Sequence, residues 1–409
     1  MSPRVSAFDE LLEHRRELAE HRTALAGNTA GAMIDALIAA APGWSDDDLE
    51  DEFCARYGAA MVQFKGGAVE DLVNPDNLAT ALLAAIDERL HQAEEAGADV
   101  VMLQRLLTVV AGVLPFPLSE SAQGMVAEHV SARAAREIGR GRTVTGPVLW
   151  ARDAYGSRWA VVAPFAAAGG PDRWYLWDVD TCGYEVVTTH SGFHPSAESA
   201  MAAWQGAVGP SAAGAALTTA DDAETLGGLL CGEVEGIRLG GEDQQQYAEY
   251  LRSRRLGRAV RDAVRRGRGR TLVPLSADDA SRQFGQRLRQ LGYPDVPAGD
   301  GSDDGPAGAE ELATELAGSW SPHDDATLYP FCSPHKVAVA VLHLRDFYME
   351  NFAAELVAVL PEWIRFLAEH TGMPAELTDR CLAYASGDLQ FPGILDEQGR
   401  LNTMARVAE

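Results

Sequence analysis

Nine arginines fall within nineteen residues, at positions 252–270, and a single acidic residue, Asp262, interrupts them. The segment has a formal charge of +8 in a chain whose formal net charge is −26, so the remaining residues carry −34. Guanidinium groups bind phosphates and carboxylates through paired hydrogen bonds. The segment is therefore expected to meet negative charge on a nucleic acid, on an acidic protein partner or on the chain's own carboxylates.

Helical spacing would turn part of this segment into a basic ridge. In a helix predicted over residues 244–266, steps of four, three and four residues share one face, which holds Arg254, Arg258, Arg261 and Arg265. Leu256 and Val260 lie on the opposite, apolar face. The full set of predicted contact residues is Arg254, Arg255, Arg258, Arg261, Arg265, Arg266, Arg268 and Arg270. The alternative is internal pairing with acidic segments such as residues 221–224 and 300–304.

Side chains that bind metals occur between His323 and His343. Cys332 and His335 lie on either side of a Ser-Pro turn, and thiolate and imidazole are both zinc ligands. A structural zinc site needs four ligands, however, and His335 and His343 are about 12 Å apart along a regular helix. The pattern favours a helix start with a buried thiol. No metal site is predicted, and Cys332 and His335 are the candidate ligands if one exists.

The N-terminal helix places a second set of such residues on one face: Glu10, His14, Glu17 and His21. Di-metal helical bundles use Glu-x-x-His on paired helices, and that spacing is absent from this set. A solvated helix face is the better interpretation.

Aromatic residues suggest another contact surface. Trp174, Tyr175 and Trp177 fall in a strand predicted over residues 173–180, where alternation separates Trp174 from the other two. Exposed aromatics on a small sheet can stack bases or anchor a partner, so these three are candidates for a recognition surface. The alternative, favoured by ordinary burial, is a sheet covered on both faces.

The elements that must position these residues are mostly helical. Helical periodicity dominates both ends of the chain, whereas the middle alternates as strands do and then ends in a helix. We predict a mainly α, multidomain protein with one inserted α+β unit, a four-stranded antiparallel meander plus a helix. The predicted division is a helical domain (1–140), the α+β unit (141–207), a linker (208–224), a helical segment with the arginine-rich helix (225–295), an acidic Gly/Pro linker (296–309) and a C-terminal helical domain (310–409).

Local signals predict where several elements begin and end. Gly27 and Asn28 are expected to stop the first helix, and Pro361 and Pro374 to occupy first helical positions. Gly372 marks a helix end, Ser196 is expected to cap the helix that follows the strands, and one apolar helix is predicted over residues 334–351. The four strands are predicted at residues 147–152, 158–164, 173–180 and 183–189.

Composition indicates an ordinary globular protein in a reducing compartment. The chain is 46% apolar and 23% charged, and its N-terminal residues become charged at once, which argues against a secretory signal. Its five cysteines are scattered without a CxxC pair, as expected of reduced thiols. We expect a cytoplasmic protein with no membrane partner.

Enzyme signatures are absent from the sequence. It has no nucleophile elbow, no P-loop and no H-E-x-x-H motif, so no catalytic residue and no cofactor are predicted. The leading hypothesis is a non-enzymatic binding or adaptor protein that engages nucleic acid or an acidic protein partner through its arginine-rich helix. Two alternatives stay open: an enzyme, including a metal-dependent one, with its site near residues 323–343, and a structural subunit of a larger assembly.

Overall fold

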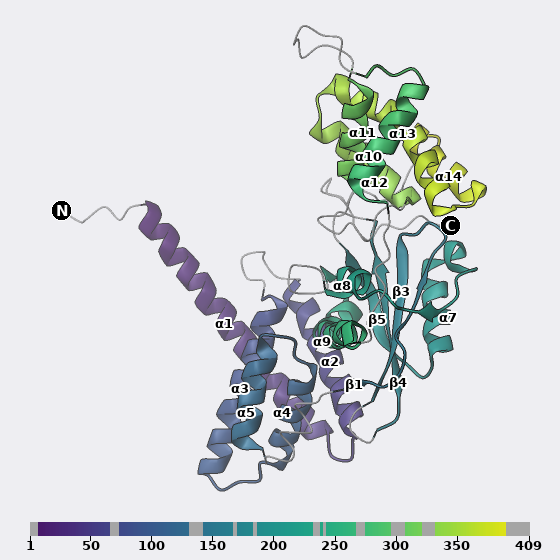
Figure 1. The fold of residues 1–409 in the computed structure, drawn as a ribbon. Coiled ribbons are helices and arrows are strands. Elements are labelled where there is room, and N and C mark those ends of the chain that lie inside the picture. The colour runs from purple at the N-terminus through teal and green to yellow at the C-terminus, as the bar shows by residue number, and fades with distance from the viewer. Residues whose placement is uncertain are drawn as a thin grey trace, which may run out of the picture. The chain divides into compact units, whose positions relative to one another are not determined.

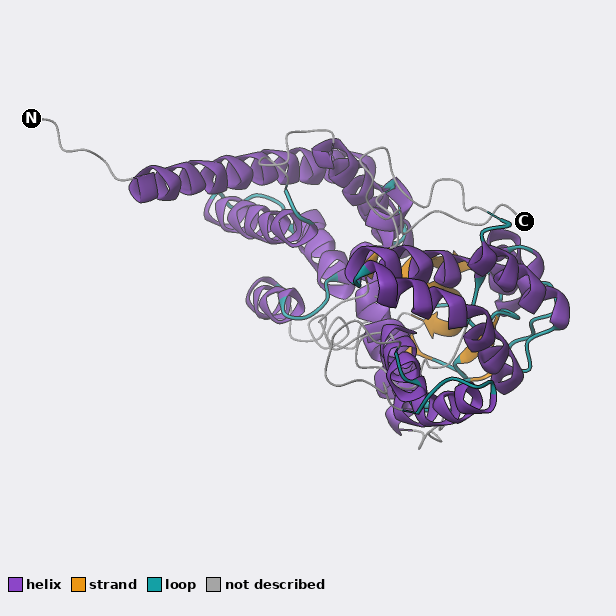
Figure 2. Ribbon diagram, turned by 90° about the horizontal axis from the view of Figure 1, so that it is seen from above, coloured by secondary structure: helices purple, strands orange, loops and turns teal. Residues whose placement is uncertain are grey.

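The computed structural model describes residues 7–65, 73–130, 142–166, 170–182, 186–231, 238–239, 243–266, 275–295, 307–320 and 332–389. The chain is mainly helical with one small, largely antiparallel sheet, as predicted (Figures 1 and 2). It divides into two compact units. Unit 1 holds residues 1–143, 166–172 and 242–259, and unit 2 holds residues 144–165, 173–241 and 260–409. The predicted six-part division stays a prediction.

Unit 1 is a bundle of helices that lie close together in Figure 1. Its helices are α1 (Ala7–Ala40), α2 (Asp46–Lys65), α3 (Pro75–Glu95), α4 (Val101–Val113), α5 (Leu118–His129) and the first part of α9 (Gln244–Arg266). Side-chain caps begin two of them: Ser45 Oγ accepts from the Asp48 amide at 3.1 Å, and Asn74 Oδ1 accepts from the Asn77 amide at 2.7 Å. Both caps satisfy amides that a helix start leaves without a partner.

The expected stop at Gly27 and Asn28 is wrong, because α1 continues through both residues. Helix α1 packs along α3, and its contact face buries side chains at helical spacing: Ala26, Ala30, Ile34 and Leu37. An interior glycine costs about 1 kcal/mol relative to alanine, whereas burying one leucine or isoleucine contributes about 1.5–3 kcal/mol. Tertiary packing therefore outweighs the local stop signal.

Helix α1 also holds a segment that is long and apolar enough to cross a membrane, Leu11–Ala40. Core helices of soluble proteins and signal sequences meet the same criterion, and part of this segment packs inside unit 1. The segment therefore does not decide the compartment, and the cytoplasmic location stays a prediction.

Helices α2 and α9 approach each other closely at Gly58. A Cβ atom built on Gly58 would lie 2.2 Å from the backbone oxygen of Gln244 and 2.7 Å from the amide nitrogen of Ala248. No side chain fits there without separating the two backbones. Gly58 thus sets how near α9 lies to α2, and with it the position of the first arginines of α9.

Unit 2 contains the sheet, in the order β6-β2-β3-β4-β5-β7 with β1 paired to β3. Four longer strands form the predicted meander: β2 (Leu149–Arg152), β3 (Arg158–Ala166), β4 (Arg173–Asp180) and β5 (Val187–His194). Three two-residue strands extend it: β1 (Thr143–Val144), β6 (Thr218–Thr219) and β7 (Arg238–Leu239). The sheet is therefore larger than the four strands predicted, because strands this short carry no detectable alternation.

Two sequence predictions about the sheet need correction. The fourth long strand begins at Val187 and continues to His194, whereas the prediction placed it at residues 183–189, of which 183–185 lie outside the described residues. Within the predicted linker 208–224, β6 pairs with β2 and a 3₁₀ turn forms at Pro210–Ala212. Backbone pairing therefore recruits part of this small, polar segment into the sheet.

Helix α7 (Ala197–Val208) packs on one face of the sheet, where Trp204 and Met201 meet Leu176 and Val162 (Figure 1). It begins at the predicted cap, with Ser196 Oγ accepting from the Ser199 amide at 3.1 Å. Helix α8 (Ala223–Cys231) contacts β4. The sheet of unit 2 therefore has helices against it.

The C-terminal helices of unit 2 share one apolar core. They are α10 (Ala277–Gln290), α11 (Ala309–Trp320), α12 (Pro334–Phe347), α13 (Glu350–Thr371) and α14 (Ala375–Ser386). Phe284, Trp320 and Trp363 meet in this core, with ring centroids 4.9 Å and 6.2 Å from that of Trp363.

Helix boundaries in this region agree with prediction only in part. Gly372 ends α13 in the left-handed conformation with φ 68°, as expected. The single helix predicted over 334–351 ends at Phe347, however, and Pro361 lies inside α13 rather than at a helix start. Pro374 caps α14 and does not occupy its first position. The core side chains on both sides of Pro361, Leu360 and Ile364, are fully buried, so packing keeps α13 continuous.

Candidate functional site

The arginine-rich helix forms where the sequence predicted it, as α9 over Gln244–Arg266. Leu256 and Val260 of its predicted apolar face are buried. The arginines of α9 do not behave alike, however. Their surroundings divide them into a set already paired with carboxylates and a set that is not.

Arg252 lies at the centre of a closed ion network in unit 1. Its Nε donates to Glu249 at 2.9 Å, and its Nη1 donates to Glu50 at 3.1 Å and to Asp51 at 2.5 Å. Glu50 also accepts from Arg142 Nε at 3.1 Å. Burial alone would lower the pKa of Arg252, but the carboxylates, Glu249 foremost, raise it well above its usual value. Arg252 is therefore a structural cation with no capacity left for a ligand.

Arg254 is also paired within unit 1. Its Nη1 lies 3.2 Å from Asp76 Oδ1 and 3.0 Å from the hydroxyl of Tyr250, and its guanidinium lies over the Tyr250 ring. The internal pairing that the sequence left open thus exists for Arg252 and Arg254. The carboxylates that pair with them come from α2, α3 and α9 itself. Residues 300–304 of the predicted acidic segments lie outside the described residues.

Arg255 and Arg258, which we call the open arginine pair, have different surroundings. Within the described part of the chain, neither forms an ion pair with a carboxylate. Arg258 is exposed, and its guanidinium carbon lies 4.8 Å from the centroid of the Phe116 ring. Burial, and then the positive charge of Arg258, lower the pKa of Arg255. The two guanidinium groups repel each other, and an anion placed between them would relieve that repulsion.

The predicted contact arginines that follow Arg258 are described only in part. Arg261 Nε is 3.6 Å from the carboxylate of its neighbour Asp262. The side chains of Arg265 and Arg266 lie outside the described residues, as do Arg268 and Arg270 entirely. Of the four residues of the predicted ridge, Arg254 and Arg261 therefore lie beside carboxylates, Arg258 belongs to the open arginine pair, and the side chain of Arg265 is not described.

The predicted aromatic recognition surface does not form as expected, because two of its three residues are fully buried. Tyr175 and Trp177 are fully buried, with ring centroids 4.9 Å from Phe193 and 6.2 Å from Phe165, respectively. Trp174 packs, half-buried, against the cluster under α7. Helices against the sheet remove the exposure that recognition would need.

Among the described residues, the metal candidates from the sequence do not belong to a group of three ligands. The Cys332 sulfur is fully buried beside Cys381, and burial raises its thiol pKa well above the usual value. His335 is buried in the first turn of α12, and His323 lies outside the described residues. His14 and His21 are exposed on α1. Across the described ranges, the residues whose ligand atoms come together lie elsewhere.

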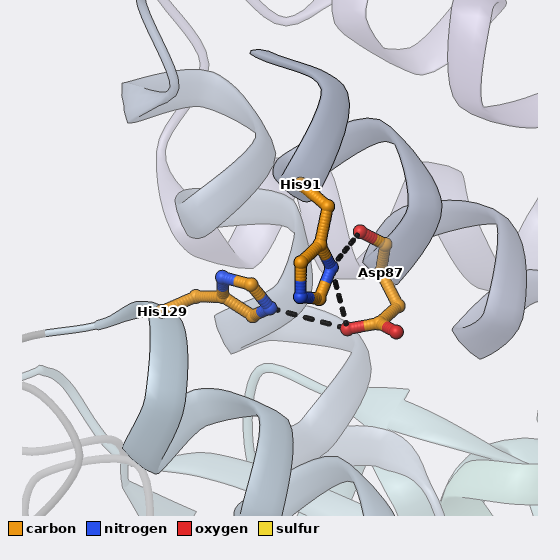
Figure 3. A group of neighbouring side chains, drawn as sticks. All are labelled: Asp87, His91 and His129. Atoms are coloured by element: carbon orange, nitrogen blue, oxygen red, sulfur yellow. Dashed lines mark hydrogen bonds and ion pairs between the residues drawn. The ribbon is translucent and has the colours of Figure 1, made fainter. Parts of the chain in front are cut away.

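That group consists of Asp87 and His91 on α3 and His129, the last residue of α5 (Figure 3). His129 Nε2 lies 3.1 Å from Asp87 Oδ1, and His91 Nδ1 lies 3.6 Å from the same oxygen. The ligand atoms of all three residues lie within 4.8 Å of one another. The His129 side chain is 2% exposed, whereas His91 is half-exposed.

Carboxylates also face the outer nitrogens of both imidazoles. Glu94 Oε1 lies 3.1 Å from His129 Nδ1, and Glu128 Oε1 lies 3.7 Å from His91 Nε2. Burial alone would lower the pKa of His129, but its hydrogen bonds to Glu94 and Asp87 outweigh burial and raise it. The cluster therefore has an affinity for positive charge, which a proton or a metal ion can supply.

Sequence reasoning missed this cluster. Asp87, His91 and Glu94 are spaced by four and three residues and so share one face of a predicted helix, which is a detectable signal. His129 lies 35 residues beyond Glu94 in the chain. Only the packing of α3 against α5 brings it to that face.

Comparison of the chain with known protein families, with curated proteins and with solved structures found no match.

Proposed function

We propose that this protein is a non-enzymatic binding protein that takes an acidic segment of a protein partner at the open arginine pair, Arg255 and Arg258. The observation that carries the proposal is that two adjacent guanidinium groups have no carboxylate partner among the described residues, on a helix whose preceding arginines are neutralised. Buried charges in proteins are normally paired, and Arg255 is partly buried with the positive charge of the exposed Arg258 beside it. An uncompensated pair therefore favours an external anion.

An acidic protein segment suits this site better than a nucleic acid does. Nucleic-acid binding proteins typically neutralise about 6–10 phosphates, which requires a long run of free cations. Internal pairing removes Arg252 and Arg254 from that run. The chain's net charge of −26 also repels a long polyanion, whereas a short acidic segment meets only the local field, since charges beyond about 8 Å are screened at physiological salt.

The test is a binding titration of the full chain with a fluorescently labelled oligoglutamate peptide, followed by anisotropy at low and at physiological salt. The double variant Arg255→Gln/Arg258→Gln should weaken binding by at least about tenfold, since each hydrogen bond to a charged group contributes about 1.5–3 kcal/mol. The matched control, Arg15→Gln/Arg282→Gln, changes the net charge equally at two exposed arginines and should leave the affinity unchanged.

A single-stranded oligonucleotide titrated in parallel decides the class of partner. Tighter binding of the oligonucleotide, lost in Arg255→Gln/Arg258→Gln, would replace the acidic protein segment with a nucleic acid. Equal affinities for the double variant and its control would contradict the proposal in either form.

A subunit of a larger assembly is the second candidate, favoured by two exposed apolar side chains. Phe347 and Met349, at the junction of α12 and α13, are 71% and 84% exposed. Large apolar groups exposed side by side are typical of protein contact sites. Mass measurement in solution tests this candidate, because Phe347→Ser/Met349→Ser should dissociate any assembly that depends on them.

A further inference from the structure

We propose that Asp87, His91 and His129 bind one divalent transition-metal ion of the zinc class, which links α3 to the end of α5. The site is separate from the open arginine pair, and its ligands are one carboxylate and two imidazoles. Such a set suits zinc and its neighbours in the first transition row, whereas calcium and magnesium prefer oxygen ligands alone.

The distances between ligand atoms fit a shared ion. Two bonds of about 2.0–2.1 Å at a tetrahedral angle place their ligand atoms about 3.4 Å apart. The two distances to Asp87 Oδ1 are 3.1 Å, from His129 Nε2, and 3.6 Å, from His91 Nδ1 (Figure 3). All three ligand atoms lie within 4.8 Å, so the remaining distance closes with a small turn of the half-exposed His91 ring.

The outer nitrogens supply a second and independent argument. Metal-binding histidines almost always donate their other N–H to a carboxylate, carbonyl or water, which fixes the ring and its tautomer. Here Glu94 faces the outer nitrogen of His129 at 3.1 Å, and Glu128 faces that of His91 at 3.7 Å. Each imidazole therefore has a carboxylate behind it, and loss of the proton from the nitrogen that faces Asp87 would direct a lone pair at an ion bound there.

Two further features favour a cation at this place. His129 is the last residue of α5, where the helix dipole presents its negative end. Asp87 and His91 are both partly exposed, so an ion can enter without opening the bundle, and a water molecule can complete the coordination.

Metal binding here exchanges protons for the ion. Without metal, His129 Nε2 and Nδ1 lie within hydrogen-bond distance of Asp87 and Glu94, and His91 Nδ1 lies 3.0 Å from the backbone oxygen of Asp87, to which a protonated Nδ1 donates. The ion takes the lone pairs of His129 Nε2 and His91 Nδ1, and the protons on those nitrogens pass to solvent. Affinity should therefore fall as pH is lowered.

The experiment is calorimetric titration of the chelator-treated full chain with Zn²⁺, repeated with Co²⁺ and followed by visible absorption, which reports coordination directly. Asp87→Asn and His91→Ala replace partly exposed ligands, so the bundle is expected to stay folded, which circular dichroism checks. His14→Ala, at an exposed histidine of α1, is the matched control.

The proposal predicts one zinc ion bound per chain at this site. His91→Ala and Asp87→Asn should weaken that binding by more than about 100-fold, and Glu94→Gln by about 10–100-fold, as for other outer partners of metal-binding histidines. His14→Ala should bind as the wild type does. Wild-type protein that binds no zinc, or zinc binding that is equally strong in His91→Ala and Asp87→Asn, would overturn the proposal.

Discussion

Arg252 and Arg258 lie on the same helix, about 9 Å apart along its axis, and their surroundings are opposite. Arg252 is 6% exposed and is held by Glu249, Glu50 and Asp51. Arg258 is exposed and has an aromatic ring and another arginine beside it. The difference comes from the neighbouring helices, because α2 presents Glu50 and Asp51 to Arg252 and α3 presents Asp76 to Arg254, whereas Arg258 meets no carboxylate among the described residues.

One run of arginines thus holds a structural cation, Arg252, and a cation that we propose binds a partner, Arg258. A buried guanidinium group is costly unless carboxylates surround it. Arg252 and its carboxylates therefore stabilise the folded state together. The open arginine pair forms no ion pair with a carboxylate among the residues that the structure describes. The two halves of the helix should therefore respond differently to the same substitution.

Arg252→Ala should have the largest effect on stability. It leaves Glu249 and Glu50 buried and short of a partner, and breaking a buried ion pair from one side costs about 3–5 kcal/mol. Urea denaturation of the full chain measures the loss. Arg258→Ala in the same assay should change the free energy of unfolding by less than about 0.5 kcal/mol, as exposed positions do. Equal losses in the two variants would remove the distinction between the halves.

Asp153 is a buried carboxyl group that can be compared with the buried cation Arg252. It is buried in the turn between β2 and β3, where its Oδ1 accepts from the amides of Ser157 and Arg158 at 2.9 Å and 3.0 Å. Burial outweighs these hydrogen bonds and raises the pKa of Asp153 to about 6. The hydrogen bonds to Asp153 therefore do not offset the cost of burying its negative charge, whereas the carboxylates around Arg252 do offset the cost of burying its positive charge.

Because the pKa of Asp153 is raised in the folded state, the free energy of unfolding depends on pH. The folded state holds the Asp153 proton more tightly than the unfolded state, so this contribution to stability is complete below about pH 4 and is lost as pH rises through about 6. Asp153→Asn keeps an oxygen acceptor and has no charge to bury. Relative to wild type, its stability should rise by about 2–3 kcal/mol between pH 4 and pH 7. A difference that stays flat across this range, measured by urea denaturation, would contradict the assignment.

Gly58→Ala tests whether the approach of α9 to α2 sustains the Arg252 network. The added methyl group would overlap the backbone of α9, and overpacking of this kind costs about 1–3 kcal/mol. Gly112→Ala on α4 is the control, because a Cβ there meets nothing within 4 Å. It should be neutral or stabilising by up to about 1 kcal/mol, since alanine favours a helix interior. Gly58→Ala as stable as Gly112→Ala would show that the close approach is not needed.

Much of the fold was predictable because its signals are local. The 3.6-residue period placed α9 at residues 244–266, and Ser196 correctly marked the start of α7. The stop predicted at Gly27 failed because contacts with α3 decide the course of α1. Local pattern is sufficient where no distant segment competes with it.

The candidate sites depend on distant contacts, and for that reason only part of them was predictable. The sequence identified Arg255 and Arg258 as members of a basic helix, but it could not show that Asp76 and Glu50 neutralise their neighbours. His129 reaches Asp87 only through helix packing. Spacing shows which residues share a face, and tertiary packing decides which faces meet.

The most direct test compares Arg258→Gln with Arg254→Gln, two single changes of equal charge on the same helix, in the oligoglutamate titration. Arg254 is paired with Asp76, whereas Arg258 has no carboxylate within the described residues. We predict that Arg258→Gln weakens peptide binding by about tenfold, in proportion to one lost charged hydrogen bond, and that Arg254→Gln leaves the affinity nearly unchanged. Equal losses in both variants, or no loss in Arg258→Gln, would contradict the division of α9 into a structural half and a binding half.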